Sequence, residues 1–521
     1  MARGPEMPTI EHLQKISNDF SLNLSLDDLN NHREAMHGAI ENLRRIDDLP
    51  APTLDVNYPR TPGHRPQPEE NPYNAWYWRT NIKGAPKGIL NGYEVGIKDM
   101  VSVAGVPMMN GARAIEGFTP TIDATIVTRI LDAGADIVGK TACADFSFSG
   151  GGHTSAYGPI KNPRKPTHSP GGSSKGSAVA LAAGDVPLAI GGDQGGSIRI
   201  PSAWCGVVGH KPTYGLVPYT GCMTIEMTLD HIGPMANSVE DAAKLLEAIT
   251  GSDGYDPRQR GINFEKINKN YSSAIGKGCE GVCIGILQEG FNQTVDTWGN
   301  IGLPPSDPIV DSKVLNAINC LEKAGADIQN ISVPLHIDGL SIWFGVAAEG
   351  TTEFMFKGNG TGTNWSGFYD VPLLDHLAKS YKTRAHDFPL TVKNLILLGE
   401  YLNRQYNGRY YAKAQNLTQT LRNAYDKAFE KVDVLVMPTI PHLPCTIPPY
   451  DADFGEYMTK ALNMINNTPQ FNLTGHPAIS IPCGMHDGLP IGLQIVGKQF
   501  DDYKVIQVAD SFEKLGNWKE L

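Results

Sequence analysis

Two glycine-rich segments, each carrying a serine, constrain this chain more than any other feature. PGGSSKGSA contains Ser173, and GGDQGGSIRIPS contains Ser197, 24 residues later. Glycines beside a serine let the backbone adopt positive φ and turn several N–H groups toward one point, as an oxyanion requires. The pair therefore predicts two loops of one catalytic centre, with Ser197 as the nucleophile and Ser173 as a proton relay.

A lysine stands 75 residues before Ser173, at the end of the apolar run VGIK. A lone lysine after a strand is most often a solvated charge, but the two serine loops favour a catalytic interpretation of Lys98. Burial at the strand end would lower the pKa of its ammonium group, and a neutral amine can accept a proton from the relay. Asp99 is assigned no chemistry, because adjacent residues of an extended segment point to opposite sides.

These segments resemble the amidase-signature hydrolases, in which a GGSS-G-S segment precedes a GGS-R-P nucleophile loop at the same spacing. The resemblance extends from about residue 90 to the C-terminus, and it maps lysine, relay serine and nucleophile onto Lys98, Ser173 and Ser197. It implies an α/β amidase-signature fold, with a mixed central β-sheet covered by helices on both faces. It also implies a cis peptide bond between Gly172 and Ser173.

The loop before Ser197 supplies the expected oxyanion donors. These are the backbone N–H groups of Gln194, Gly195 and Gly196, together with that of Ser197. The resemblance further implies that Asp193 and Arg199 pair to hold the loop. Their apolar neighbours make a weak surface ion pair the poorer explanation.

Three further residues lie in or near the signature. Phe146 and Trp343 are weaker candidates for lining an apolar acyl pocket, since large aromatic residues are as often ordinary core. Lys175 departs from the family pattern, in which glycine or serine is more usual. The sequence leaves the effect of this bulky cation on the loop undecided.

Other catalytic arrangements match parts of the sequence. Ser174 lies in a GxSxG pattern, but the proline-broken stretch NPRKPTHSPGG before it cannot form the strand that such an elbow requires. A Ser-His-Asp triad stays open, because four histidines lie near the signature. They are His153, His168, His210 and His231. Cys279 and Cys283 lack further ligands at zinc spacing, so neither a metal nor another cofactor is expected.

Composition limits the partners. A net charge of −11 argues against binding to nucleic acid. The eight cysteines are scattered, as in proteins of reducing compartments, and there is no apolar leader or 18-residue apolar run. We therefore expect a cytoplasmic protein without membrane contact.

The chain is expected to divide near residue 85. Residues 1–85 form an N-terminal helical segment, with helices at 9–18 and 26–47 and Ser25 as an N-cap, followed by a proline-rich arm. Residues 86–521 form the amidase-signature domain, with a smaller, mainly helical subdomain inserted at about 335–430 around the glycine-rich loop 357–367. The N-terminal helices either cover the core or, as the resemblance implies, make dimer contacts and lid the substrate entrance.

Within the larger domain, apolar runs alternate with amphipathic segments, as in layered α/β proteins. Strands are expected at 93–97, 187–191, 282–287, 432–437, 478–482 and 491–496. Helices are expected at 124–134, 174–183, 239–249 and 313–323.

The resemblance is greatest to stand-alone amidases associated with nitrile hydratases. It implies hydrolysis of small aliphatic or aromatic carboxamides to acid and ammonia through an acyl-enzyme, in a homodimer without cofactors. Two alternatives use the same chemistry: a carbamate (urethane) hydrolase, and a glutaminase-type component of an amidotransferase. A third is a binding protein that has kept the fold and lost the activity.

Overall fold

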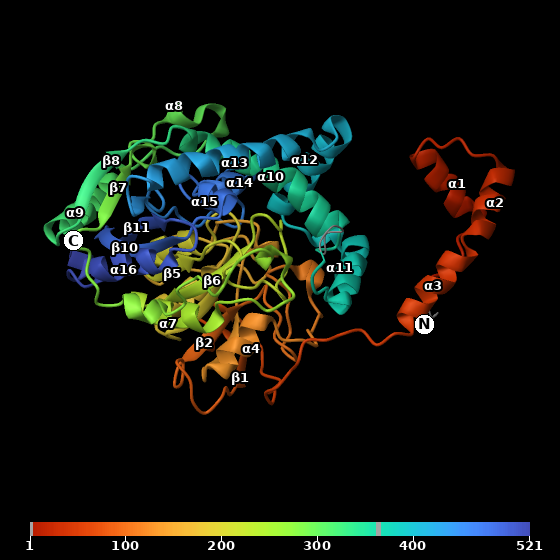
Figure 1. Ribbon diagram of the computed structural model, residues 1–521, viewed down its shortest axis with the longest axis horizontal. Helices are drawn as coiled ribbons and strands as arrows, with labels where there is room; N and C mark the ends of the chain where they lie inside the picture. The colour runs from red at the N-terminus through yellow and green to blue at the C-terminus, as the bar shows by residue number, and fades with distance from the viewer. Residues whose placement is uncertain (1–3, 361–365, 521) are drawn as a thin grey trace. The chain divides into compact units, whose positions relative to one another are not determined.

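The computed structural model describes residues 4–360 and 366–520, and the chain forms two compact units, Met1–Leu54 and Asp55–Leu521 (Figure 1). The division falls earlier than the expected boundary near residue 85, because Trp76–Ile82 form a strand of the larger unit's sheet. The middle of the expected glycine-rich loop 357–367 lies outside the described residues.

The first unit is helical. Its described residues form three helices: α1 (Ile10–Asp19), α2 (Leu26–Ala35) and α3 (His37–Asp47). Ser25 caps α2 as predicted, since its hydroxyl accepts the Asp28 N–H and the Asp28 carboxylate accepts the Ser25 N–H. The single helix expected over 26–47 is interrupted at Met36, next to Gly38, a residue type with weak helix propensity.

The second unit is built on one mixed sheet, to which the described residues contribute 11 strands in the order β1-β3-β2-β4-β6-β5-β10-β11-β9-β7-β8. β2 lies parallel to β3 and β4, and β7 lies parallel to β8 and β9. The strands are β1 (Trp76–Ile82), β2 (Glu94–Lys98), β3 (Asp136–Thr141), β4 (Leu188–Asp193), β5 (Val208–Lys211), β6 (His231–Ala236), β7 (Cys283–Leu287), β8 (Asp327–Ile331), β9 (Val434–Pro438), β10 (Ala478–His486) and β11 (Leu489–Gly497).

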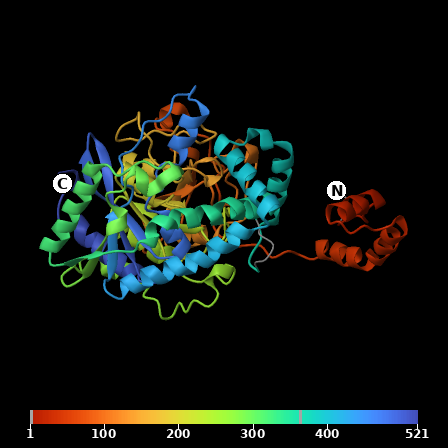
Figure 2. The ribbon, with the colours of Figure 1, turned by 90° about the horizontal axis from the view of Figure 1, so that it is seen from above.

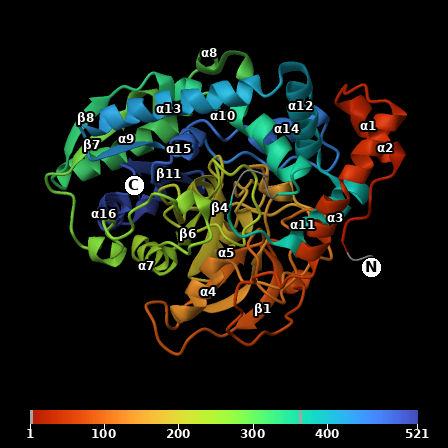
Figure 3. The same ribbon diagram turned by 45° about the vertical axis from the view of Figure 1, so that its right-hand side comes forward.

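Helices cover both faces of this sheet, as predicted. Helices in contact with its strands include α4 (Thr125–Asp132), α5 (Lys175–Ala183), α6 (Arg199–Cys205), α7 (Val239–Ile249), α9 (Pro308–Lys323) and α16 (Asp502–Glu513). The unit also contains α8 (Val295–Trp298), α14 (Phe454–Leu462) and α15 (Pro469–Thr474). Val138 and Ala189 share a buried cluster with α5, whereas Ile137 and Ile190, their neighbours in β3 and β4, share another with α4 and α7. Alternate strand residues thus fill two cores, and α5 lies beside β4 (Figure 3).

Between 335 and 430 the described residues form helices and no strand. They are α10 (Leu335–Thr351), which continues into a π-helical turn (Thr352–Lys357), α11 (Val371–Thr383), α12 (Leu390–Tyr406) and α13 (Arg409–Phe429). α10 packs against α12 and α13 (Figure 2). Within the described part of the chain, no helix combines the length and apolar character needed to cross a membrane.

The sheet order positions the predicted site residues. Since β2 and β4 are adjacent and parallel, their carboxyl ends lie at the same edge of the sheet. Lys98 is the last residue of β2, and Asp193 is the last residue of β4. In open α/β sheets this edge is the usual place for a ligand site.

Candidate active site

Lys98 and Ser173 are in direct contact. The Lys98 Nζ donates to Ser173 Oγ at 2.8 Å and to the Gly192 carbonyl oxygen at 3.1 Å, and both side chains are fully buried. Burial lowers the pKa of Lys98 to about 8. The peptide bond between Gly172 and Ser173 is cis, as the resemblance implies. A neutral Lys98 would therefore have a hydroxyl within proton-transfer distance.

Ser174 joins this contact to the loop that holds Ser197. Its N–H donates to the Ser197 carbonyl oxygen at 3.2 Å, and its hydroxyl donates to the Gly192 carbonyl oxygen at 3.1 Å. The GxSxG serine is thus a brace between two loops. Ser197 borders a small cavity that Gly172 also lines, so the two serine loops meet at one place.

Asp193 organises residues 193–198, which we call the glycine loop. Its carboxylate accepts from the N–H groups of Gly196 (2.7 Å) and Ile198 (3.1 Å) and forms a buried ion pair with Arg199 at 2.9 Å. The Asn472 side-chain amide adds a further bond at 2.8 Å. Burial alone would raise the pKa of this carboxyl, but Arg199 and Asn472 bring it well below its usual value. The carboxylate thus stays charged and holds the loop.

Side chains from other segments donate hydrogen bonds to two carbonyl oxygens of the glycine loop. Trp343 Nε1 donates to the Gln194 oxygen at 2.8 Å, and Thr468 Oγ1 donates to the Gly195 oxygen at 2.6 Å. Among the described residues, the N–H groups of Gln194, Gly195 and Ser197 have no hydrogen-bond acceptor. Gly196 differs from our expectation, because its N–H is already donated to Asp193. Three N–H groups of this loop are thus available to bind an anion.

The cavity beside Ser197, the Ser197 cavity, measures about 40 Å³. Trp343 lines it, and Phe148 lines it where Phe146 was expected. The prediction for Phe146 was wrong, because its fully buried ring packs against three other aromatic residues. They are Phe356, Tyr381 and Phe388. The remaining lining is Ser147, Ser149, Gly150, Gly172, Gln194, Gly195, Ser197, Ile200, Ile225, Leu229, Ala347, Thr351, Leu462 and Ile465.

No histidine is among the described residues that line the Ser197 cavity. His210 pairs with Asp502 at 2.9 Å, and His231 contacts the Leu229 carbonyl oxygen at 2.8 Å. His153 contacts the Tyr457 carbonyl oxygen at 3.1 Å. These contacts are structural, and a Ser-His-Asp triad at Ser197 finds no support. Among all residues that the structure describes, no group of three or more His, Cys, Asp or Glu side chains could hold a metal ion.

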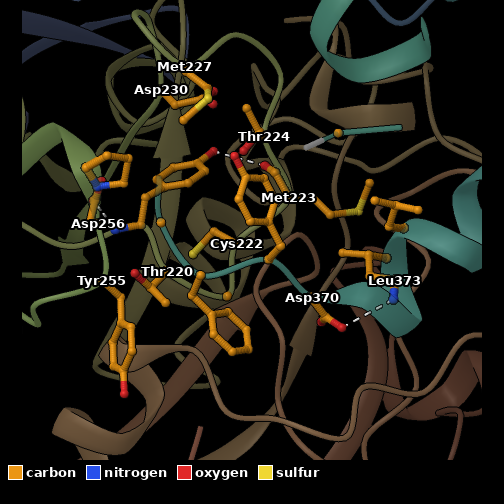
Figure 4. Close-up of a pocket in the computed structure, with 18 of the residues that line it drawn as sticks. Thr220, Cys222, Met223, Thr224, Met227, Asp230, Tyr255, Asp256, Asp370 and Leu373 are labelled. Atoms are coloured by element: carbon orange, nitrogen blue, oxygen red, sulfur yellow. Dashed lines mark hydrogen bonds between the residues drawn. The ribbon is translucent and has the colours of Figure 1, made fainter. Parts of the chain in front are cut away.

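A second cavity, of about 100 Å³, is lined in part by the segment 219–230, whose Ile225 and Leu229 line the Ser197 cavity. Figure 4 shows Met223, Thr224 and Asp230 bordering it, with Asp370 accepting the Leu373 N–H at the start of α11. Tyr219 links the two sites. It lines this cavity, and its hydroxyl accepts a hydrogen bond from the Gln194 side chain at 2.9 Å.

Lys175 is a fully buried cation that ties α5 to the loop 149–154. Its Nζ donates to the carbonyl oxygens of Gly151 (2.7 Å) and Thr154 (3.2 Å) and to Thr154 Oγ1 (3.2 Å). Burial lowers the pKa of Lys175 to about 7. Because Ser149 and Gly150 of the same loop line the Ser197 cavity, the lysine braces one wall of that cavity.

Sequence reasoning missed the segment 466–474, which supplies Thr468 and Asn472 to the glycine loop. Its polar side chains are completely buried, which is unusual for asparagine and glutamine. They are Asn466, Asn467, Thr468, Gln470, Asn472 and Thr474. The polar run NNTPQFNLT just before an apolar strand was the available signal.

Comparisons with known proteins agree with this geometry. The family model described as Amidase matches residues 67–506. An enantioselective amidase of Rhodococcus rhodochrous is 43% identical over 456 residues, which cover 87% of this chain and 85% of that protein. A glutamyl-tRNA(Gln) amidotransferase subunit of Methanosarcina acetivorans is 38% identical over 436 residues, covering 82% and 85%.

Solved structures are similar as well. The native peptide amidase of Stenotrophomonas maltophilia superposes with a TM-score of 0.65 at 28% identity, over 82% of this chain and 83% of that one. The corresponding glutamyl-tRNA(Gln) amidotransferase subunit of Thermotoga maritima gives a TM-score of 0.66 at 29% identity, over 82% and 84%. The protein is therefore a hydrolase that acts on amides. It belongs to the amidase-signature family.

The brace made by Lys175 leads to a prediction. Lys175→Met keeps the length of the side chain but removes three hydrogen bonds to buried oxygens of Gly151 and Thr154, so the loop 149–154 should shift and KM should rise about 3- to 10-fold. Steady-state kinetics and thermal unfolding measure the two effects. Lys211→Met is the matched control, because Lys211 is equally buried and donates to the His476 and Pro212 carbonyl oxygens away from the cavity. It should lower the melting temperature and leave KM unchanged; an equal KM in all three proteins would refute the brace.

Proposed function

We propose that this enzyme hydrolyses small aliphatic or aromatic carboxamides to a carboxylic acid and ammonia. Ser197 is the nucleophile, Ser173 the proton relay and Lys98 the base. The observation that carries the proposal is the buried 2.8 Å contact between Lys98 and Ser173 beside the cavity that Ser197 borders. Similarity to an enantioselective amidase supports the choice of substrate.

In the first half of the reaction, Ser197 Oγ attacks the amide carbon and its proton passes through Ser173 to Lys98. The tetrahedral oxyanion accepts from the free N–H groups of the glycine loop. A single donor of this kind typically contributes about 2.7–4 kcal/mol of transition-state stabilisation. The relay then returns the proton to the nitrogen, the C–N bond breaks, ammonia leaves, and Ser197 is acylated.

In the second half, water replaces ammonia at the same position. The relay removes its proton as it attacks the acyl carbon, and then protonates Ser197 Oγ as the C–O bond breaks. The carboxylic acid is released and the starting protonation state is restored. The largely apolar Ser197 cavity receives the acyl group.

The second candidate is a glutaminase-type component of an amidotransferase, favoured by the 38% identity to a glutamyl-tRNA(Gln) amidotransferase subunit. The DQGGS sequence at 193–197, where DTGGS is more typical of that component, weighs against it. A carbamate hydrolase would use the same acyl-enzyme chemistry. All three functions need Ser197, and they differ in the group attached to the carbonyl carbon that Ser197 attacks.

We also infer a homodimer that forms through the N-terminal unit. Phe20 and Leu26 are 75% and 61% exposed, and further apolar side chains of this unit are exposed as well. They are Ile16, Leu22, Leu43, Ile46 and Leu49. So many exposed apolar residues within about 50 positions are typical of an interaction surface.

The main experiment measures ammonia release from propionamide, benzamide, glutamine and ethyl carbamate. The wild type should release ammonia from the simple amides, and Ser197→Ala should lose this activity by at least about 10⁴-fold while keeping its fold. Ser173→Ala should lose most amide turnover and retain some acylation by activated esters. Release from glutamine alone would instead favour the amidotransferase component, and release from ethyl carbamate alone the carbamate hydrolase.

The pH dependence tests Lys98 as the base. Its folded pKa is lowered to about 8, so the neutral, proton-accepting form increases as the pH rises through that value. The kcat/KM for a simple amide should therefore fall about tenfold per pH unit below pH 7 and level off above about pH 9. Rates measured from pH 5 to 10 would check this. A profile that is flat down to pH 5 would exclude Lys98 as the base.

The dimer is tested by light scattering on the full chain. The wild type should have twice the mass of one chain, and Phe20→Glu with Leu26→Glu should give the monomer, because two buried carboxylates oppose association. An exposed apolar residue of the larger unit, Leu397→Glu, serves as the control. A wild-type mass of one chain would contradict the inference.

A further inference from the structure

One side of α10 borders the Ser197 cavity. Trp343, Ala347 and Thr351 line it at intervals of four residues, which places them on one face of the helix. Trp343 is bonded to the Gln194 oxygen, so this end of the face lies against the glycine loop. At 1.5 Å per residue, Thr351 is about 12 Å further along the helix axis. It therefore borders the part of the cavity remote from the glycine loop.

The hydroxyl group of Thr351 is unusual for a helical threonine. Its side chain is completely buried, and Oγ1 has no hydrogen-bond partner in the part of the chain that the structure describes. Thr352 and Thr418 instead donate to the carbonyl oxygens four residues earlier, Ala348 and Ala414, both at 3.0 Å. Thr391 of α12 shares the lack of a partner, but it is not among the residues that line the Ser197 cavity. A buried hydroxyl without a partner is unfavourable, and here it occurs on the wall of a ligand cavity.

The surroundings of Thr351 indicate what kind of group would pair with it. Ala347, between Thr351 and Trp343, is small and leaves space along the helix face. The helix widens into its π-helical turn directly after Thr351, and such turns are frequent at functional sites. Apart from Gln194, whose amide donates to Tyr219, the other large side chains of the wall are apolar: Phe148, Ile200, Ile225, Leu229, Leu462 and Ile465. A fitting ligand is apolar along most of its length and carries one hydrogen-bonding atom at its end.

We propose that Thr351 makes the enzyme selective for carboxamides whose acyl chain is apolar near the scissile carbonyl and carries an oxygen at its far end. This inference rests on the proposed amide hydrolysis and names its substrate class. The Thr351 hydroxyl donates to an ether oxygen, or exchanges hydrogen bonds with a hydroxyl group, so an oxygen is preferred to a methylene group of the same size.

The test compares 7-methoxyheptanamide with nonanamide, which differ by one oxygen in place of a methylene group. The ether oxygen lies seven bonds from the carbonyl carbon, so an extended chain can bring it to Thr351. The ratio of their kcat/KM values should fall about 3- to 10-fold in Thr351→Val, which replaces the hydroxyl by a methyl group. Thr351→Ser keeps the hydroxyl and should keep the wild-type ratio. For 2-hydroxypropanamide against 2-methylpropanamide, whose oxygen lies beside the carbonyl, the ratio should be the same in all variants.

Thr352→Val is the matched control, since its hydroxyl is already bonded to the helix, and it should leave both ratios unchanged. The inference is overturned if wild type and Thr351→Val show the same ratio for the first pair, or if Thr352→Val lowers it equally. Ammonia release from both members at an unchanged ratio would refute only this inference. Release from no simple amide, in an enzyme that still folds, would refute the proposed function and this inference with it.

Discussion

The carboxylate of Asp193 is the interaction on which the site depends. It gathers two backbone N–H groups, the Arg199 guanidinium and the Asn472 amide at the end of a buried strand. Arg199 in turn donates to Gln494 on β11, at 2.9 Å. A buried ion pair is weak evidence for stability, but removing one partner leaves an uncompensated charge. Here the pair fixes the turn of a loop in which, among the described residues, the N–H groups of Gln194, Gly195 and Ser197 have no acceptor.

Two buried lysines at the same edge of the sheet have different contact partners. Lys140 on β3 faces the Asp99 carboxylate at 3.0 Å. Lys98, on the neighbouring strand, has a hydroxyl and a carbonyl oxygen as partners and, among the described residues, no carboxylate within 4 Å. Desolvation without a counter-charge favours the neutral amine. Asp99, which takes no part in the proposed chemistry, thus compensates Lys140 and leaves Lys98 uncompensated.

Local patterns predicted much of the fold, and long-range contacts explain what they missed. The strands at β2, β4, β7, β9, β10 and β11 follow from their apolar runs. β6 (HIGPMA) contains glycine and proline, and β1 (WYWRTNI) groups its aromatic and its polar residues without alternation, so neither shows a clear strand pattern. Lys98, Ser173 and Ser197 were recognisable from motif and spacing. The bond from Asn472 to Asp193 spans 279 positions, and no local pattern reports it. The place of Phe146 could not be predicted for the same reason, because its ring packs against residues of segments more than 200 positions away.

Trp343 both bonds to the glycine loop and lines the Ser197 cavity. Its indole nitrogen holds the Gln194 carbonyl group, and its ring closes the Ser197 cavity; a side chain on Gly195 would come within 2.8 Å of that ring. Replacing it to admit a bulkier ligand would also release the glycine loop. Substitutions that change the shape of the cavity without disturbing the loop are therefore expected at Ala347, Thr351 and Leu462, which line the cavity and make no bond to that loop. The end of the cavity that Thr351 borders can therefore change in shape while the Trp343 contact keeps the end beside the glycine loop unchanged.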